Sequence, residues 1–428
     1  MKYENESASE LLLGFSQADI TPKGSVQTVG FGRADEYARG VRGRLIAQVS
    51  TWRLGDETGC LIAIDHIGFS IEHANALRDE IGEILNVARE KVMLCFSHTH
   101  SAPNDSIEAN WFDETRQKIA GCAKNAAQAM TPVFIAWGNA RTTIGVNRRA
   151  ENAEMDDRIG ILKVVDAKTG ANRLALLRLT AHANVLKGDN YDISPDYFGS
   201  VRDALSEKLG CPVMLTQGAS GDVAPRYFDS EITPPDAADD RFIRSKTALA
   251  DMAREVAADA LPVWEALRPR KARRFRMYAR VIELNADVPT IARAREIAEE
   301  ALRYCGIDGN GWMKEVERLN ETGIQSQTDS AEIQYFALDD GCLCGVPYEI
   351  LCGFALRASE MLGDDFFYFG GYTNGSAGYL PTEEAFDEGG YEVYWSMLVF
   401  YMYYHRVFPF RRESASQLIR FAADNAPR

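Results

Sequence analysis

The chain has 428 residues, of which 46% are hydrophobic and 25% charged, a composition typical of globular proteins and unlike that of disordered, fibrous or membrane-spanning chains. Its formal net charge of -15 makes nucleic acids and anionic membranes poor partners, because both repel an acidic surface. The first residues lack the basic start and apolar core of an export signal, and no stretch approaches the ~20 apolar residues of a spanning helix, so we expect a cytoplasmic protein without stable membrane association.

The first half of the chain predicts strands that alternate with helices, judged by the period of the apolar residues. Residues 71–85 have helical spacing. Residues 161–165 and 174–179 flank a turn at Lys168-Thr169-Gly170, which predicts a hairpin. Four further apolar runs have the length and composition of strands: 44–54, 60–67, 91–96 and 132–137.

The second half of the chain adds helices and further strands. Helical patterns cover 197–209, about 240–260, 349–362 and the two charged segments 289–304 and 312–319. Strand patterns cover 212–216, 273–284 and 331–346, the last folded around a turn at Asp339-Asp340-Gly341. Pro262 should end the long helix, and the helix 349–362 should begin at Glu349.

The last sixty residues contain two unusual segments. Residues 370–390 combine glycine, tyrosine and asparagine, which favours an ordered loop of the kind that often carries function. Residues 399–404 form an aromatic stripe that we expect in the core. Local pattern alone therefore indicates a mixed α/β chain, and composition does not determine the number of domains.

Two of the six histidines, His98 and His100, directly follow the predicted strand 91–96. In open α/β sheets ligands bind beyond the carboxyl ends of strands, and an extended His-x-His directs both imidazoles to the same side. One imidazole could bind a metal while the other faces substrate. Taken alone, the motif is equally compatible with two hydrogen-bonded structural histidines.

Two further metal-binding side chains stand at the exits of other predicted strands. His182 follows the apolar run 174–180, and Glu349 follows 341–346. Two imidazoles and one carboxylate leave a position open for water, which is the arrangement of a catalytic zinc ion. Such an ion lowers the pKa of its water to about 7 and polarises a carbonyl, so the set predicts a zinc-dependent hydrolase.

Other polar residues are weaker candidates. Asp65, at the end of the run 60–67, could orient a ligand histidine, whereas we expect His66 to be a core histidine. The glycine-bearing run 217–226 could be a tight active-site loop that includes Asp222, or merely a turn. The eight cysteines form no CxxC pair, which argues against a cysteine-bound zinc.

Colinear motifs over nearly the whole chain resemble the catalytic domain of the neutral, non-lysosomal ceramidase family. They are Ala18-Asp19-Ile20-Thr21-Pro22, Gly30-Phe31-Gly32, His98-Thr99-His100-Ser101-Ala102-Pro103, Asn147-Arg148, the strand-borne His182, Gly221-Asp222-Val223-Ala224-Pro225, Gly345-Val346-Pro347-Tyr348-Glu349 and the stretch from Gly378-Tyr379 to Tyr391-Glu392. The resemblance implies an α/β fold of two mixed sheets packed together and flanked by helices, in αββα layers.

The resemblance also implies roles for individual residues. Zinc would be bound by His98, His182, Glu349 and Tyr379. The attacking group would be a metal-bound water, and the bond an amide. Three residues would face the scissile amide and stabilise the developing oxyanion: His100, Arg148 and Tyr391. Independently of the resemblance, Asp65 and Asp222 are candidates for residues that contact and orient the ligands.

This sequence departs from the family in several places. Ala224 replaces a serine, so that hydroxyl cannot be essential here, and Tyr348 replaces a glycine beside Glu349, where we expect it to reshape the pocket. We expect one catalytic domain over residues 1–428 without the family's immunoglobulin-like carboxyl-terminal domain.

The sequence indicates the substrate less directly than it indicates the metal ligands. No amphipathic basic helix or apolar surface segment suited to collecting a lipid is evident, so we expect a small soluble amide rather than membrane ceramide. An ester, lactone or glycoside hydrolase on the same site, and a non-catalytic metal-binding homologue, remain alternatives. The sequence does not indicate the oligomeric state.

Overall fold

The computed structural model describes residues 10–149, 154–231 and 240–427, so the chain start that bears on an export signal lies largely outside it. Its largest element is an 8-stranded sheet in the order β13-β11-β10-β8-β1-β4-β5-β6. The pairs β5–β6 and β11–β13 are parallel, and β10–β11 is the expected hairpin. The strands are β1 (Leu12–Asp19), β4 (Ile46–Leu54), β5 (Glu57–Ile64), β6 (Val92–Phe96), β8 (Thr131–Arg141), β10 (Arg158–Asp166), β11 (Asn172–Leu179) and β13 (Val213–Gln217).

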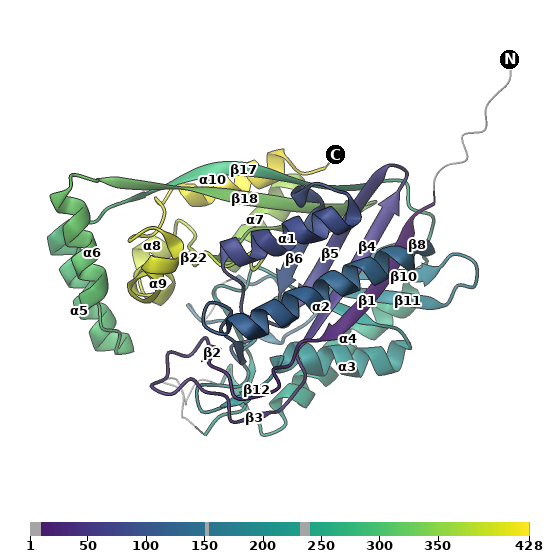
Figure 1. Cartoon of the computed structure of the whole chain (residues 1–428), viewed down its shortest axis with the longest axis horizontal. Helices are drawn as coiled ribbons and strands as arrows, with labels where there is room; N and C mark the ends of the chain where they lie inside the picture. Colours follow the sequence, from purple (N-terminus) through teal and green to yellow (C-terminus); the bar gives the residue numbers. More distant parts are fainter. Residues whose placement is uncertain (1–9, 150–153, 232–239, 428) are drawn as a thin grey trace, which may run out of the picture.

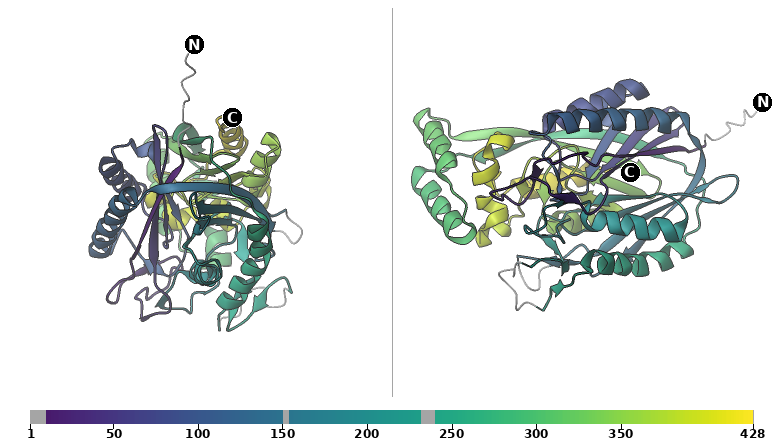
Figure 2. Two further views of the ribbon diagram at one scale, coloured as in Figure 1. Left: turned by 90° about the vertical axis from the view of Figure 1, so that its right-hand side faces the viewer. Right: turned by 60° about the horizontal axis from the view of Figure 1, so that its bottom comes forward.

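This sheet bends sharply between β1 and β8, which share only two residue pairs, Leu12↔Pro132 and Leu13↔Thr131. The bend brings the two halves of the sheet face to face. The side chain of Gln48 on β4 donates to the carbonyl of Val213 on β13 at 3.0 Å. The edge strands β6 and β13, at opposite ends of the strand order, therefore become neighbours. The helices drawn in blue and those drawn in teal lie on opposite sides of the molecule (Figure 2, left).

A second sheet of four strands packs on the core between these halves, in the order β17-β18-β19-β21. Its strands are β17 (Phe275–Asp287), β18 (Ser326–Leu338), β19 (Gly341–Gly345) and β21 (Phe367–Gly370). The two sheets approach closely at Gly160 on β10, where an added Cβ would lie 2.6 Å from the ring of Tyr368. A side chain at that position would force the sheets apart.

Helices cover the outer faces, because their apolar sides pack on the outward-facing residues of the strands. The pair α1 (Ile71–Leu85) and α2 (Ala109–Gln128) covers one half of the large sheet, and α3 (Asp196–Leu209) with α4 (Ala248–Ala266) covers the other (Figure 1). The small sheet is covered by α7 (Cys352–Leu362) and α10 (Ser414–Asp424). The expected αββα arrangement is thus confirmed.

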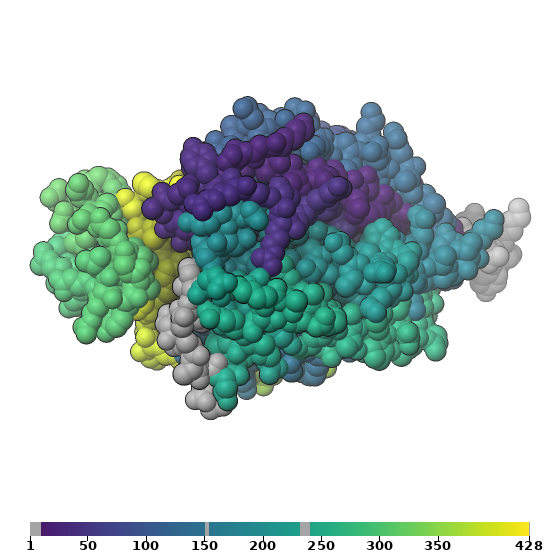
Figure 3. Space-filling view, turned by 90° about the horizontal axis from the view of Figure 1, so that it is seen from below, coloured from purple at the N-terminus to yellow at the C-terminus, as the bar shows by residue number. Residues whose placement is uncertain are grey.

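The strands β17 and β18 run on beyond the sheet as a two-stranded ribbon. The ribbon carries α5 (Ile291–Cys305) and α6 (Asn310–Glu321) at one end of the molecule, where they pack on α9 (Met397–Tyr404). Seen from below, this helix pair projects beside the carboxyl-terminal segment that contains α8 (Ala385–Glu388), the π-helix Tyr391–Trp395 and α9 (Figure 3). Within the described residues no helix is long and apolar enough to cross a bilayer.

Short strand pairs connect the loops beyond the main strand ends. They are β2 (Thr28–Val29) with β7 (Ala102–Pro103), β3 (Gly40–Val41) with β12 (Asp192–Ile193), β9 (Gly145–Asn147) with β14 (Val223–Pro225), β15 (Tyr227–Phe228) with β16 (Ile243–Arg244), and β20 (Glu349–Ile350) with β22 (Tyr379–Leu380). The loops around the candidate residues are therefore ordered by backbone hydrogen bonds.

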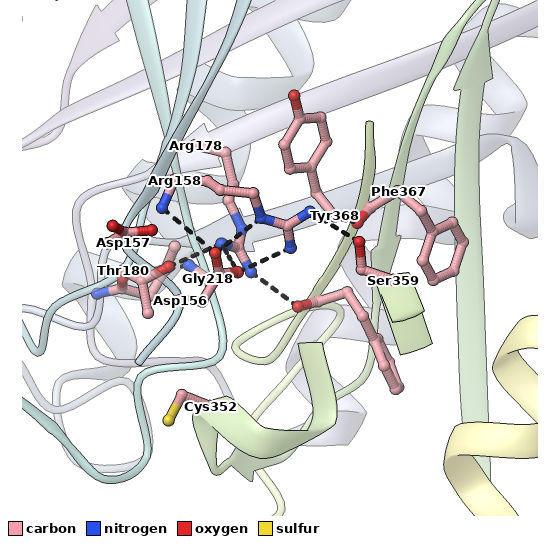
Figure 4. Close-up of polar contacts among 12 residues, drawn as sticks. Asp156, Asp157, Arg158, Arg178, Thr180, Gly218, Cys352, Ser359, Phe367 and Tyr368 are labelled. Atoms are coloured by element: carbon pink, nitrogen blue, oxygen red, sulfur yellow. Dashed lines mark hydrogen bonds and ion pairs between the residues drawn. The ribbon is translucent and has the colours of Figure 1, made fainter. Parts of the chain in front are cut away.

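A buried ion network joins the large sheet to the small one (Figure 4). Asp156 accepts hydrogen bonds from Arg158 and from Arg178, both at 2.8 Å. Arg158 also donates to Ser359 on α7, and Arg178 donates to the carbonyl of Phe369 on β21. Burial alone would raise the pKa of Asp156, but the two guanidinium groups hold it well below its usual range.

Most predicted elements are present, with four errors. The long helix expected from about residue 240 begins only at Ala248, after the short strand β16. Pro262 lies inside α4 and does not end it; it is exposed, so water can bind the carbonyl that lacks its N–H donor. Glu349 lies on β20 and not at the start of a helix, which begins at Cys352. The stripe 399–404 is core only in part: Tyr404 is buried, but Val399, Met402 and Tyr403 are 41%, 64% and 55% exposed.

Candidate metal centre

The predicted metal ligands converge from four segments. His98 lies two residues after β6 and His182 three residues after β11, while Glu349 and Tyr379 face each other as a register pair of β20 and β22. The backbone at His98 is left-handed, with φ 64°, so the His-x-His is not extended as expected. The imidazoles of His98 and His100 nevertheless meet, with ring centroids 5.1 Å apart.

Hydrogen bonds to backbone carbonyls determine where each of three imidazoles carries its proton. Nδ1 lies 2.7 Å from the carbonyl of Ile67 in His98, 3.0 Å from that of Gly30 in His100 and 3.0 Å from that of Ser220 in His182. A carbonyl can only accept, so each Nδ1 must donate. In the neutral ring each Nε2 is then left with a lone pair, the form in which histidine binds metal.

The carboxylate of Glu349 faces two of these lone pairs. Its Oε2 lies 3.1 Å from Nε2 of His98 and 3.7 Å from Nε2 of His182. Within the described residues this oxygen is buried without a hydrogen-bond donor, as is Nε2 of His100. Acceptors that face one another in a buried space are unfavourable unless a proton or cation lies between them. The donor set therefore fits a metal ion.

The environment also keeps two of the imidazoles neutral. Burial, reinforced by the neighbouring His98, lowers the pKa of both His100 and His182 well below the usual range. One ligand atom from each of His98, His100 and His182 lies within 4.8 Å of those of the other two. The group could hold a metal ion.

Arg148 connects the metal ligands to the candidate substrate side. It follows β9, and its guanidinium donates to Glu392 at 2.8 Å, to the carbonyl of Gly221 at 2.7 Å and to the hydroxyl of Tyr379 at 3.2 Å. The ring of Tyr391 lies 5.8 Å from that of Tyr379. Burial and the Glu349 carboxylate raise the pKa of both phenols, so Tyr391 is a neutral donor.

A pocket of about 680 Å³ opens onto these residues. It is lined by His98, His100, Glu349, Tyr379 and Tyr391, among others. One wall is α9, whose exposed Val399, Met402 and Tyr403 belong to the rim and not to the core. A larger groove of about 1460 Å³ lies elsewhere, beside Arg270 and Asp340, and contains none of the candidate ligands.

The two aspartates expected to support the site, Asp65 and Asp222, have different hydrogen-bond partners. Asp65 does not orient a ligand histidine; its carboxylate binds Arg202 at 2.8 Å and the N–H of Ile46 at 2.8 Å, so backbone carbonyls orient the imidazoles in its place. Asp222 accepts from the N–H of Cys352 at 2.7 Å and from Asn147 at 3.0 Å. It thereby joins the segment before Arg148 to the segment after Glu349.

The structure also shows where three other residues considered from the sequence lie: His66, Tyr348 and Ala224. His66 is a core histidine, fully buried and bonded to the carbonyl of Pro103. Tyr348 does not line the pocket. Its side chain is buried in the core beneath α7 and α10, against Phe410. Ala224 lies on β14, which pairs with β9.

Two residues of the site were not predicted. Tyr372 lies against His98, with ring centroids 4.4 Å apart, and its hydroxyl accepts from Ser220. Glu392 is buried between Arg148 and Arg149, which donate to it at 2.8 and 2.7 Å. Tyr372 falls in the loop 370–390, the only signal that pointed to it, and Glu392 stands beside Tyr391 in a quoted motif.

No protein-family model and no curated protein sequence matches the chain. Among solved structures, a neutral ceramidase from Pseudomonas aeruginosa is similar, with a TM-score of 0.72 and 17% identity over 97% of this chain and 74% of that one. A ceramidase described as complexed with C2 gives a TM-score of 0.71 and 16% identity over the same shares. The chain therefore has the fold of the neutral ceramidase catalytic domain.

Proposed function

We propose that the protein is a zinc-dependent hydrolase that cleaves an amide (N-acyl) bond. His98, His182 and Glu349 would hold the ion, with Tyr379 as fourth protein ligand. The observation that carries the proposal is the buried Glu349 Oε2, which faces imidazole lone pairs at 3.1 and 3.7 Å. The likeness of fold to a protein named as a ceramidase supports the choice of an amide.

The residues around the ion divide the remaining work. A zinc ion there would polarise a carbonyl and lower the pKa of a bound water to about 7. Arg148 and Tyr391 are N–H and O–H donors and suit the developing oxyanion. His100 differs from that expectation, because its Nδ1 donates to Gly30 and its Nε2 can only accept. It is therefore suited to accept a proton from the attacking water and not to stabilise an oxyanion.

The pocket modifies the substrate class that we expected. We expected a small soluble amide because the sequence shows no apolar surface segment. The structure has such a segment, since apolar side chains of α9 are exposed beside the pocket. An amide with an apolar acyl or amine part would bury these side chains and gain about 0.8 kcal/mol for each CH₂ removed from water.

Metal analysis and a hydrolysis screen test the proposal together. The purified chain should contain one zinc per molecule and should release an amine from N-acyl compounds, and dialysis against a chelator should remove both zinc and turnover. His98→Ala and Glu349→Gln serve as zinc-deficient controls. Turnover confined to esters, lactones or glycosides would replace the amidase proposal, and stoichiometric zinc without any turnover would indicate a binding protein.

A further inference from the structure

The metal centre spans the bend of the large sheet. His98 follows β6 and His182 follows β11, and these strands belong to opposite halves. Along the hydrogen-bonded ladder, β6 reaches β11 only through β5, β4, β1, β8 and β10, and the β1–β8 step consists of two pairs. The ladder alone therefore fixes the distance between the two histidines poorly.

A buried glutamine connects the two halves at this point. Gln217, the last residue of β13, is 5% exposed. Its Nε2 donates to the carbonyl of Ser97 at 3.2 Å and to the carbonyl of Ala181 at 2.7 Å. Ser97 immediately precedes His98, and Ala181 immediately precedes His182. Both hydrogens of one amide group are thus used to join the peptides that carry the two imidazoles.

The residues that follow Gln217 reach the other ligands. The carbonyl of Ser220 accepts from Nδ1 of His182, and the N–H of Gly221 donates to the carbonyl of Ile350, next to Glu349. The glycine-bearing run 217–226 therefore holds the candidate metal ligands in place through hydrogen bonds. It is more than the simple turn considered from sequence, but its residues contact the ligands and do not line the pocket. Backbone bonds of Gly371 and Tyr372 add a second connection between the halves.

We propose that Gln217 is a positioning residue that sets the separation of His98 and His182. The inference rests on the proposed function for the identity of the bound group, zinc, and on hydrogen bonds alone for the coupling of the two segments. Metal ligands must lie within ±0.2 Å of their ideal distances. Loss of the link should therefore weaken zinc binding more than it weakens the fold.

The test uses Gln217→Met, which keeps the volume of the side chain and removes both donors. Tyr197→Phe is the first control, since the Tyr197 hydroxyl donates to the same Ala181 carbonyl but not to Ser97. Gln48→Met is the second, because Gln48 also bonds across the halves, to Val213, but away from the histidines. All three lose hydrogen bonds from buried side chains.

Hydrogen exchange of the metal-free chain measures the coupling without reference to zinc. The amides of His98 and His182 are bonded to the carbonyls of His66 and Val223. We expect Gln217→Met to speed exchange at both amides, Tyr197→Phe only at His182, and Gln48→Met at neither. Unchanged exchange at either amide in Gln217→Met would overturn the inference, even if the parent protein binds no zinc.

Zinc affinity, measured by competition with a chromogenic chelator, gives the second readout. We expect Gln217→Met to bind zinc about 10- to 100-fold more weakly than the parent, the range found when groups behind metal ligands are removed. The two controls should stay within about threefold at a similar loss of urea resistance. An equal loss of affinity in all three variants would mean a general structural role and would contradict the proposal. A parent chain without zinc would instead contradict the proposed function.

Discussion

At the scale of single residues, His98 and His100 are two positions apart yet have different surroundings. Nε2 of His98 lies 3.1 Å from Glu349, whereas Nε2 of His100 is buried in the pocket wall without a partner among the described residues. We expect His98→Ala to abolish zinc binding and turnover together. His100→Ala should retain zinc and lower kcat about 10²- to 10⁴-fold, as for loss of a general base. Zinc content and kcat measured on the same preparations check this, and equal zinc loss in both would contradict it.

Tyr391 supports a second prediction, because its phenol is a neutral donor beside Tyr379. Tyr391→Phe should lower kcat about 10²- to 10³-fold, the cost of one oxyanion donor, and leave zinc content and KM nearly unchanged. Tyr394→Phe is the matched control, since Tyr394 lies on the same π-helix but packs against Phe408. A similar loss of kcat in both variants would assign the effect to the helix and not to the phenol.

His98, His182 and Glu349 could be found from sequence because each follows a recognisable apolar strand, whereas Tyr379 was expected only from resemblance to a family. The residues that hold them could not be found in that way. The carbonyls of Ile67, Gly30 and Ser220 fix the imidazole tautomers, and a carbonyl is present at every residue, so no side chain marks them. The role of Asp65 was wrongly predicted for a different reason. Its charged partner, Arg202, is distant in sequence, so the residues around Asp65 give no sign of the ion pair.

At the scale of elements, α9 forms an apolar wall of the pocket. Met402→Gln and Tyr403→Ser should change the free energy of unfolding by less than about 0.5 kcal/mol, because both side chains are exposed. For amides with an apolar acyl chain, each should raise KM about 5- to 30-fold, equivalent to 1–2 kcal/mol of lost contact, with kcat unchanged.

The control for this wall is Leu302→Gln on α5, a residue 60% exposed that does not line the pocket. Steady-state kinetics on a series of acyl chain lengths is the measurement. If KM is equally insensitive in all three variants, α9 does not contact the substrate.

The sequence predicted an element well where the apolar residues have a clear helical period, as in α1, or where apolar runs flank a turn, as in the β10–β11 hairpin. It failed at α9 because nearly every residue there is apolar or aromatic, so the pattern cannot show which face is exposed. Glu349 was placed on a helix because the strand β20 has only two residues, too few for a period.

At the scale of the whole molecule, the bend of the large sheet depends on pairings between distant strands, such as β1 with β8. Local periodicity carries no information on such pairings, and the αββα layers were expected only from resemblance to a family. The charged residues Asp156, Arg158 and Arg178 gave no sign in the sequence that they would meet at the junction of the two sheets.

That junction provides the last prediction, since Asp156 is fully buried between two arginines. Asp156→Asn should cost about 3–5 kcal/mol of unfolding free energy at neutral pH, because it leaves two buried guanidinium groups uncompensated. The pKa of Asp156 is lowered from 3.8 in the folded chain, so its contribution is complete above about pH 5 and is lost as the pH falls through the unfolded value toward the folded one. Urea unfolding from about pH 7 to pH 3 should therefore show a steeper decline for the parent than for the variant. A constant difference between the two curves would mean that the carboxylate does not titrate with unfolding, and that the network joins the sheets by shape and not by charge.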